Sequence, residues 1–290
     1  MHFFVILHTS MLGAHAKINL GLYVVERRPD GYHNIETVFH RIGIADTLRL
    51  TEATGITVTS SSPDVPSDPT NICYKAAAML RQHLGVTRGV HIHIEKVVPV
   101  GAGLGGGSAD AAAVLRELPE FWGTTASEET LRTCALQLGS DVPYFLSTGS
   151  AVAHGRGEIL EYFPLDVPFA ILVCNPNIHV STAWAYGQIR PGTKGKPDNL
   201  RTAVLAGMKN PDVLRSSLRN DFEPVVFAAY PAVRDLKARM LDAGAVFALM
   251  SGSGSSVFGL FSDSASASAC AVPLRELGYR TFITDPHFGI

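Results

Sequence analysis

Apolar and polar side chains alternate between residues 16 and 25, with Lys17 and Asn19 on the polar side of the pattern. A period of two is the period of a β-strand that buries one face, so we expect a strand here. A turn follows at Pro29-Asp30-Gly31, whose residue types favour tight turns. Alternating or continuously apolar runs predict further strands at residues 37–50, 55–61, 89–100, 168–176, 245–250, 256–261 and 279–284.

Helical periodicity marks other segments of the chain. A helix at residues 72–84 should end before Gly85, and a helix at residues 108–118 should end at Pro119. Ser127, followed by two glutamates, is typical of a helix start, and this helix should end at Gly139. Further helices are expected at residues 181–189, 232–244 and 264–277.

Strands and helices mix without strict alternation, which is typical of the α+β class. The chain of 290 residues is near the length at which a single core divides into two. Because the pattern restarts near residue 161, we expect two lobes, an N-terminal domain at residues 1–160 and a C-terminal domain at residues 161–290.

The composition is that of an ordinary globular protein, with 46% hydrophobic and 17% charged residues and a net charge of −2. Lysine and arginine are scattered, so no basic patch for nucleic acid or an anionic membrane is expected. The four cysteines have neither C-x-x-C nor metal-ligand spacing, which favours a reducing cytoplasm. His91 and His93 alternate with apolar residues, so we interpret them as a polar sheet face rather than metal ligands.

The first twelve residues, MHFFVILHTSML, are mostly apolar. They lack the basic start and the small-residue cleavage site of a signal peptide, and they are too few to cross a bilayer. We interpret them as an edge strand, or as an over-long start with Met11 as the true beginning.

The segment PVGAGLGGGSADAAAVL, residues 99–115, places five glycines among seven positions between an expected strand and an expected helix. Glycine loses the most backbone entropy on folding, so such a cluster needs a reason. A strand, a glycine-rich loop and a helix N-terminus expose several backbone N–H groups, which is the usual construction of a phosphate site. A turn that only lets strand and helix pack closely would need fewer glycines, so we expect phosphate binding.

Three common phosphate loops match this segment poorly. The spacing of Gly101, Gly103 and Gly106 satisfies the dinucleotide-binding pattern, but another helix follows where a second strand with an acidic end is required. The P-loop spacing nearly matches, except that Gly107 stands where its lysine would be. A protein-kinase loop would need H-R-D and D-F-G partners, and neither string occurs.

The segment closely resembles the signature loop of the GHMP small-molecule kinases, with Ala109 where many relatives carry a second serine. The segments AHAKINLGLYV, RPDGYHNIETVF, LGSDVPYFLSTGSAVAHGRGE and MSGSGSSVFGLF also resemble motifs of this family, so the likeness extends from about residue 14 to residue 261. The glycine loop specifies only the superfamily. A-K-I-N-L and D-G-Y-H are typical of its branch that phosphorylates 4-diphosphocytidyl-2-C-methyl-D-erythritol.

This resemblance implies a two-lobed GHMP-kinase fold, with an N-terminal ribosomal-protein-S5-like domain and a C-terminal ferredoxin-like α/β-plait domain. It implies transfer of a phosphoryl group from ATP, with Mg²⁺, to the 2-hydroxyl of the methylerythritol unit, in the methylerythritol phosphate pathway to isoprenoid precursors. The expected partner is this small molecule, with no nucleic acid and no membrane. The protein is expected to be a cytoplasmic monomer or weak homodimer.

The resemblance also implies roles for single residues at the reacting centre. Lys17 is expected to be the cation and Asp141 the base that takes the substrate proton, with Asn19 as a substrate contact. A solvated strand face and a turn-capping aspartate are the alternatives. Tyr32 and His33 are expected to hold the cytosine ring, and simple packing is the alternative.

The nucleotide site implied by the resemblance centres on the glycine loop. Its residues are Pro99, Val100, Gly101, Ala102, Gly103, Leu104, Gly105, Gly106, Gly107 and Ser108, flanked by Asn71 and Lys96. The SGSGS segment at residues 251–255 is either a hairpin turn or a second glycine loop that lines the phosphates. No residue is assigned to a metal ion.

Two other functions are compatible with the sequence. Another GHMP kinase, of the mevalonate or homoserine type, would share the glycine loop, although the D-G-Y-H segment argues against it. A catalytically inactive nucleotide-binding regulator on the same fold would usually have lost the base, whereas Lys17 and Asp141 are both present.

Overall fold

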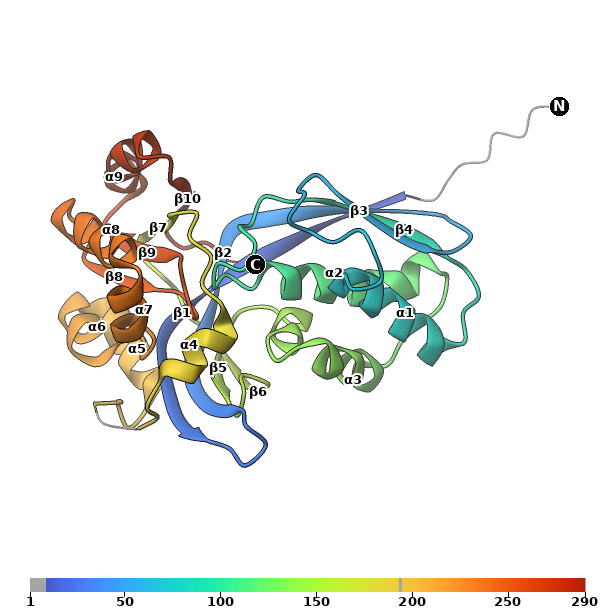
Figure 1. The fold of residues 1–290 in the computed structure, drawn as a ribbon, viewed down its shortest axis with the longest axis horizontal. Helices are drawn as coiled ribbons and strands as arrows, with labels where there is room; N and C mark the ends of the chain where they lie inside the picture. The colour runs from blue at the N-terminus through green and yellow to red at the C-terminus, as the bar shows by residue number, and fades with distance from the viewer. Residues whose placement is uncertain (1–8, 193–194, 290) are drawn as a thin grey trace. The chain divides into compact units, whose positions relative to one another are not determined.

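The computed structural model describes residues 9–192 and 195–289, whose elements group into two compact units (Figure 1). The described part of the first unit comprises residues 9–15, 45–100 and 106–147. The second unit comprises residues 16–44, 101–105 and the chain from residue 148 onward. Because the units are interleaved along the sequence, the division into domains at residues 1–160 and 161–290 stays a prediction.

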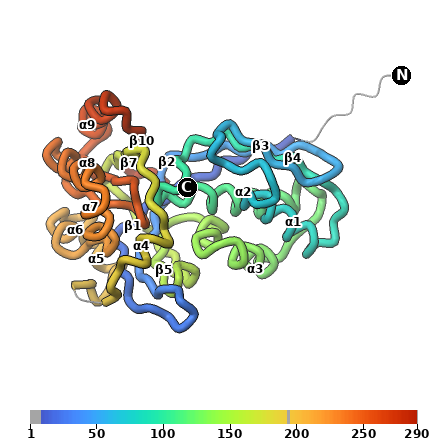
Figure 2. The backbone as a smooth tube through the Cα atoms, in the orientation of Figure 1, coloured from blue at the N-terminus to red at the C-terminus, as the bar shows by residue number. Residues whose placement is uncertain are grey.

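Two long strands at the start of the chain contribute to both units. β1 (Thr9–Arg27) and β2 (His33–Thr51) pair with each other, and the backbone can be followed through both in Figure 2. The predicted turn joins them, with the N–H of Gly31 donating to the carbonyl of Arg28 at 3.1 Å. Residues 1–8 of the apolar N-terminal segment lie outside the described residues, and its remainder begins β1.

The C-terminal part of β2, in the first unit, belongs to a six-stranded sheet. It pairs antiparallel with β4 (Val90–Glu95), and β4 pairs parallel with β3 (Ile56–Ser60). Alternate side chains such as Leu48 and Ile92 are fully buried, as the period of two predicts. The helices of this unit are α1 (Ile72–Leu84), α2 (Gly106–Phe121), α3 (Glu128–Leu138) and the 3-10 helix η1 (Val142–Leu146).

The predicted end of the strand before the glycine loop is wrong. β4 ends at Glu95 rather than at residue 100. The reason is the carboxylate of Asp46, which accepts hydrogen bonds from the N–H groups of Val97 at 2.6 Å and Val98 at 2.8 Å. These donors are therefore used by a side chain and not by a neighbouring strand.

The predicted ends of the following helix are also wrong. α2 begins at Gly106 and continues through Pro119 to Phe121. Proline removes one backbone donor from a helix, but the helical pattern resumes when the N–H of Trp122 donates to the carbonyl of Leu118 at 2.9 Å. Trp122 is also buried, so packing favours continuation of the turn. By contrast, α1 and α3 begin and end close to the predicted positions.

In the second unit, the N-terminal part of β2 pairs antiparallel with β5 (Ser150–His154), and β5 pairs antiparallel with β6 (Ile159–Phe163). A separate antiparallel sheet has the strand order β10-β7-β9-β8. Its strands are β7 (Ala170–Asn175), β8 (Phe247–Met250), β9 (Val257–Phe261) and β10 (Arg280–Thr284).

The helices α8 (Pro231–Asp242) and α9 (Ser264–Glu276) pack against this separate sheet (Figure 1). Helices follow its first and third strands, so its strand order gives the β-α-β-β-α-β arrangement of a ferredoxin-like fold. The α+β class and the C-terminal plait are thereby confirmed. The connection from β7 to β8 also holds α4 (Thr182–Gln188), α5 (Leu200–Lys209), α6 (Pro211–Ser217) and α7 (Glu223–Ala229).

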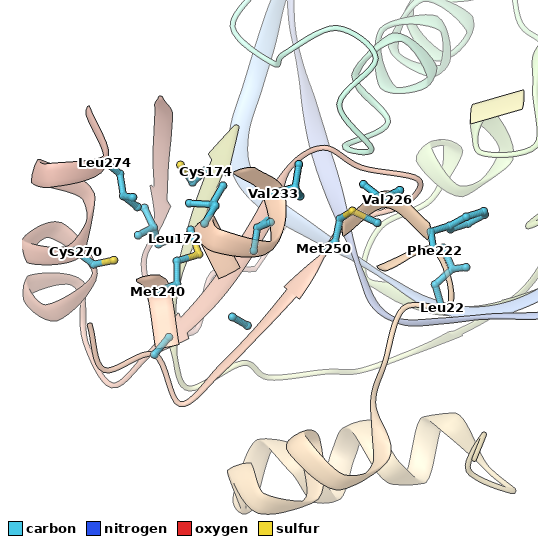
Figure 3. Close-up of a cluster of buried hydrophobic side chains, with 14 of the residues drawn as sticks. Leu22, Leu172, Cys174, Phe222, Val226, Val233, Met240, Met250, Cys270 and Leu274 are labelled. Carbon is cyan, nitrogen blue, oxygen red and sulfur yellow. The ribbon is translucent and has the colours of Figure 1, made fainter. Parts of the chain in front are cut away.

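One buried apolar cluster joins the plait to its helices (Figure 3). Its labelled members are Leu22, Leu172, Cys174, Phe222, Val226, Val233, Met240, Met250, Cys270 and Leu274. Burying one such side chain contributes about 1.5–3 kcal/mol. Leu22 belongs to β1, so this cluster fixes the strand that carries Lys17 to the C-terminal sheet of the same unit.

Candidate active site

Lys17 and Asn19 are buried, with 3% and 1% of their surfaces exposed. The ammonium of Lys17 donates to Asn19 Oδ1 at 2.7 Å, and Asn19 Nδ2 donates to Thr37 Oγ1 at 2.9 Å. Lys17 Nζ also lies 5.0 Å from the centre of the Phe39 ring. A buried ammonium is costly without hydrogen bonds and negative charge near it. The solvated-face alternative is therefore wrong, and the role of Lys17 as the cation of the reaction stays a prediction.

The carbonyl oxygen of Gly103 connects Lys17 to the SGSGS segment. It accepts hydrogen bonds from Lys17 Nζ at 3.2 Å and from Ser251 Oγ at 2.9 Å. Ser251 is fully buried and follows β8 directly. The SGSGS segment thus joins β8 to β9 as a hairpin turn, and it also packs on the glycine loop.

The glycine loop, residues 101–105, is fixed through its apolar residues. The N–H of Lys17 donates to the carbonyl of Leu104 at 3.0 Å, and the N–H of Ser256 donates to the carbonyl of Ala102 at 3.3 Å. Ala102 and Leu104 are both buried. Fixing these two residues leaves the alternate positions, Gly101, Gly103 and Gly105, to make the turns, and all three have positive φ.

Gly103 and Gly105 are required to be glycine for different reasons. Gly103 has φ 79, and a Cβ there would overlap the carbonyl oxygen of Ser251. The close neighbour at Gly103 is therefore the protein's own backbone. Gly105 has φ 70, a left-handed conformation that side-chain-bearing residues rarely adopt.

The remaining nucleotide-site predictions concern the first unit, at the N-termini of α1 and α2. A Cβ on Gly107 would meet only Ile72 Cγ2, at 3.8 Å, so the first turns of these helices are neighbours. The first N–H groups of a helix lack intrahelical partners, which favours an anion there. Asn71 caps α1, accepting from the N–H of Cys73 at 2.7 Å and donating to the carbonyl of Pro66 at 2.6 Å. Its nucleotide contact stays a prediction.

Lys96 is held between two carboxylates in the first unit. Its Nζ lies 2.5 Å from Asp46 Oδ2 and 2.7 Å from Asp110 Oδ2, and its side chain is 5% exposed. Burial alone would lower the pKa of Lys96, but the carboxylates of Asp110 and Asp46 outweigh burial and raise this pKa. Lys96 is therefore charged and held by two ion pairs, and its nucleotide contact stays a prediction.

The ion pairs of Lys96 with Asp46 and Asp110 lie next to the start of α2. Burial raises the pKa of Asp110, and the ammonium of Lys96 opposes that rise. Among the described residues, Asp110 Oδ1 has no hydrogen-bond partner. A Cβ on Gly106 would come within 3.1 Å of Lys96 Nζ, so the ammonium packs against the start of α2.

Asp141 directly precedes η1 and is half-buried. Its side chain makes no capping hydrogen bond to that helix. Asp141 therefore does not cap η1, and its role as a base stays a prediction.

Tyr32 and His33 follow the turn between β1 and β2. His33 stacks on Tyr186 of α4, with ring centres 5.0 Å apart and planes at 20°. Tyr32 is 57% exposed, and the guanidinium carbon of Arg156 lies 4.8 Å from its ring centre. Burial lowers the pKa of His33, and the nearby cation of Arg27 adds to the effect. A neutral imidazole has one donor and one acceptor, which suits the polar edge of a planar base.

Thr37, Asp46 and Tyr186 were not predicted as parts of the site. Thr37 lies on β2, and only the pairing of β2 with β1 brings its hydroxyl within hydrogen-bond distance of Asn19. Asp46 contacts Lys96, which is fifty residues further along the chain. No sequence pattern reports such contacts. Tyr186 had a weak signal, because it lies in a predicted helix with two aromatic residues.

The described residues contain no group of three or more His, Cys, Asp or Glu that could hold a metal ion. His91 instead lies between two hydroxyls, with Nδ1 2.8 Å from Thr57 Oγ1 and Nε2 3.2 Å from Thr59 Oγ1. Within residues 9–192 and 195–289, no helix has the length and apolar character needed to cross a membrane. All four cysteines are free and buried.

Two protein-family models match the chain. The model described as the GHMP kinases N terminal domain matches residues 71–149, which include the glycine loop and Asp141. The model described as GHMP kinases C terminal matches residues 204–280, which include the SGSGS segment.

Similar proteins cover nearly the whole chain. A 4-diphosphocytidyl-2-C-methyl-D-erythritol kinase of Chlorobium chlorochromatii is 46% identical over 278 residues, which cover 95% of this chain and 96% of the relative. A crystal structure of a 4-(cytidine 5'-diphospho)-2C-methyl-D-erythritol kinase has a TM-score of 0.81 at 35% identity and covers 97% of this chain and 100% of its own. A homoserine kinase of Cytophaga hutchinsonii has a TM-score of 0.75 at 19% identity, covers 99% of this chain and 97% of its own, and shares the fold alone.

Proposed function

Because the chain belongs to the GHMP kinases, in the family of the 4-diphosphocytidyl-2-C-methyl-D-erythritol kinases, we propose that it uses ATP to phosphorylate the 2-hydroxyl of 4-diphosphocytidyl-2-C-methyl-D-erythritol. The products would be ADP and the 2-phospho derivative, on the pathway to isoprenoid precursors. The observation that carries the proposal is the buried ammonium of Lys17, which donates to the carbonyl of Gly103 in the middle of the glycine loop.

The proposed phosphate-binding segment is residues 101–108. ATP, bound with Mg²⁺, supplies the phosphoryl group, and the metal neutralises part of the phosphate charge. Gly101 and Gly107 are exposed, so their backbones are accessible to a ligand. The first turn of α2 adds N–H donors that have no partner in the helix. Lys96, held by two carboxylates, would place its positive charge next to the start of α2. Asn71 would lie at the start of the neighbouring helix, α1.

Asp141 is proposed as the base and Lys17 as the cation of the reaction. The oxygen of the 2-hydroxyl forms the new bond to phosphorus as its proton passes to the carboxylate of Asp141, and ADP leaves. Phosphoryl transfer depends mainly on positioning and on charge, so one base and fixed cations suffice. Hydrogen bonds to Asn19 Oδ1 and to the Gly103 carbonyl fix the position of the Lys17 ammonium. A fixed cation next to the glycine loop supports this role.

The cytosine ring is proposed to bind next to Tyr32 and His33. Tyr186 joins this subsite because its ring is already stacked on His33. Tyr186 also packs in a T-shaped arrangement with the buried Phe222, with ring centres 4.8 Å apart, so the stack is anchored in the core of the second unit. A fixed aromatic surface binds a planar base at low entropic cost.

We also propose that the protein works in the cytoplasm as a monomer or weak homodimer, with Mg²⁺ entering together with ATP. The four buried free thiols support a reducing compartment. Light scattering during size-exclusion chromatography measures the oligomeric state. A stable tetramer or larger assembly would contradict this part of the proposal.

ADP release with a panel of alcohols tests the function. We expect turnover of 4-diphosphocytidyl-2-C-methyl-D-erythritol, and little turnover of mevalonate or homoserine. Lys17→Met should abolish turnover, whereas Lys75→Met, which changes an exposed lysine of α1, should not. Preferred turnover of mevalonate or homoserine would indicate another GHMP kinase. ATP binding without turnover of any alcohol would indicate the inactive regulator.

A further inference from the structure

Asn220 lies between β1 and the SGSGS segment, and its side-chain amide is fully used. It is 1% exposed, with Nδ2 donating to the carbonyls of Met250 at 2.7 Å and Gly252 at 2.8 Å. Its Oδ1 accepts from the N–H of Phe222 at 2.9 Å. These two carbonyls belong to the residues on either side of Ser251, so Asn220 fixes both neighbours of that serine.

The backbone around Asn220 is also tied to β1. The N–H of Leu22 donates to the carbonyl of Arg219 at 2.8 Å, and the N–H of Asp221 donates to the carbonyl of Leu22 at 2.9 Å. These two bonds form an isolated parallel bridge between Leu22 and Asn220. Leu22, Phe222, Val226 and Met250 belong to the same buried cluster, and Figure 3 shows the side chains of Leu22 and Phe222 near each other. Asn220 therefore joins β1 to the SGSGS segment.

A short series of hydrogen bonds leads from Asn220 to Lys17. Asn220 holds the peptide groups beside Ser251, and Ser251 Oγ donates to the Gly103 carbonyl at 2.9 Å. The same carbonyl accepts from Lys17 Nζ at 3.2 Å. If the segment moved away, Gly103 would lose one of its two donors and the carbonyl would no longer be fixed for Lys17.

We propose that Asn220 is a positioning residue for the phosphoryl transfer, acting through Ser251 on the Gly103 carbonyl and the Lys17 ammonium. It touches neither the proposed substrate nor the proposed phosphate segment. This inference rests on the proposed function for its kinetic effect. Its structural effect, a fixed contact between the SGSGS segment and the glycine loop, is measurable without any substrate.

Asn220→Asp is the sharpest variant because it keeps the shape and the acceptor for Phe222 but removes both N–H donors. Asn220→Ala serves if the aspartate variant does not fold. Asn199→Ala is the matched control, since Asn199 caps α5 in the same unit by accepting from the N–H of Thr202 at 2.8 Å. Displacing a reacting group by a small distance is enough to cost a large factor in rate. We therefore expect kcat to fall by about tenfold or more for the Asn220 variant and to stay within about twofold for N199A.

A double-mutant cycle with Ser251→Ala separates positioning from loss of stability. If Asn220 acts through the Ser251 hydroxyl, the Asn220 variant should lower kcat by less than about threefold in the S251A background. Multiplicative losses would overturn the proposal. The kcat of N220D relative to wild type should also rise on acidification, because a protonated carboxyl regains one donor.

Amide hydrogen exchange tests the same contact when no alcohol is turned over. In the full-length Asn220 variant, peptides covering residues 101–105 and 251–255 should exchange faster than in wild type, whereas N199A should leave them unchanged. Unchanged exchange in these peptides would overturn the proposal whether or not the protein phosphorylates its proposed substrate. An inactive wild-type protein with faster exchange in the variant would refute only the proposed function.

Discussion

Replacing Gly103 by alanine tests how the glycine loop is held. Gly103 has φ 79, and left-handed alanine costs about 1–2 kcal/mol. The new methyl group would overlap the Ser251 carbonyl oxygen, so the SGSGS segment has to move away. Moving it breaks the Ser251 hydrogen bond, about 0.5–1.5 kcal/mol, and disturbs the charged one from Lys17, about 1.5–3 kcal/mol. We expect Gly103→Ala to lower the free energy of unfolding by roughly 3–6 kcal/mol.

Urea unfolding measures this loss, and Gly107→Ala is the matched control. Gly107 is exposed in the first turn of α2, where a Cβ would meet only Ile72 Cγ2 at an ordinary 3.8 Å. Alanine does not destabilise a helix relative to glycine, so the control should unfold at the wild-type urea concentration or above it. Calorimetry should nevertheless show weaker ATP binding for Gly107→Ala if phosphate binds this backbone. A Gly103→Ala protein as stable as wild type would show that the Ser251 contact does not fix the loop.

Three further outcomes are expected. Asp141→Asn should lower kcat by about 10²–10⁴-fold with ATP affinity nearly unchanged by calorimetry, and half of wild-type kcat would remove Asp141 from the mechanism. His33→Ala should lower kcat/KM for the cytidylylated substrate, because it removes a stacking contact worth about 1–3 kcal/mol. It should hardly change kcat/KM for 2-C-methyl-D-erythritol 4-phosphate, which has no cytosine. Equal losses would show that cytosine binds elsewhere. Burial lowers the pKa of His40 from 6.5 to about 4, so on acidification the unfolded chain binds the proton before the folded protein does. The free energy of unfolding should therefore fall by up to about 3 kcal/mol as the pH drops from 6.5 to about 4. His40→Gln should flatten this part of the urea-unfolding profile, and an unchanged slope would assign the acid sensitivity to another group.

Local patterns predicted the elements that carry strong local signals. The alternation at residues 16–25 predicted β1, Gly85 marks the end of α1, and Ser127 marks the start of α3. Failures occurred where a distant side chain decides the outcome. The strand before the glycine loop stops early because Asp46, about fifty residues away, accepts from Val97 and Val98. Short helices such as α6, with seven residues, have too few turns to show a period.

The candidate site was predicted by residue type but not by its contacts. The glycine run predicts a phosphate loop, yet nothing in it shows that Ser251 occupies the space beside Gly103. Likewise, Lys17 and Asn19 share a face by periodicity, but their burial follows from neighbours such as Thr37 on another strand. Contacts between segments far apart in the sequence are set by tertiary packing, which a local pattern does not encode.

The bridge between Leu22 and Asn220 also constrains the order of events during synthesis. The ribosome makes Leu22 early, and the partner segment appears only after almost two hundred further residues. At about 5–20 residues per second, β1 waits roughly 10–40 s before this contact can form. During that time Leu22 lacks its partner Asn220, although β1 can already pair with β2. No contiguous fragment of the chain consists of one compact unit alone. A fragment of residues 161–290 would therefore lack residues 16–44 of the second unit, and with them Lys17.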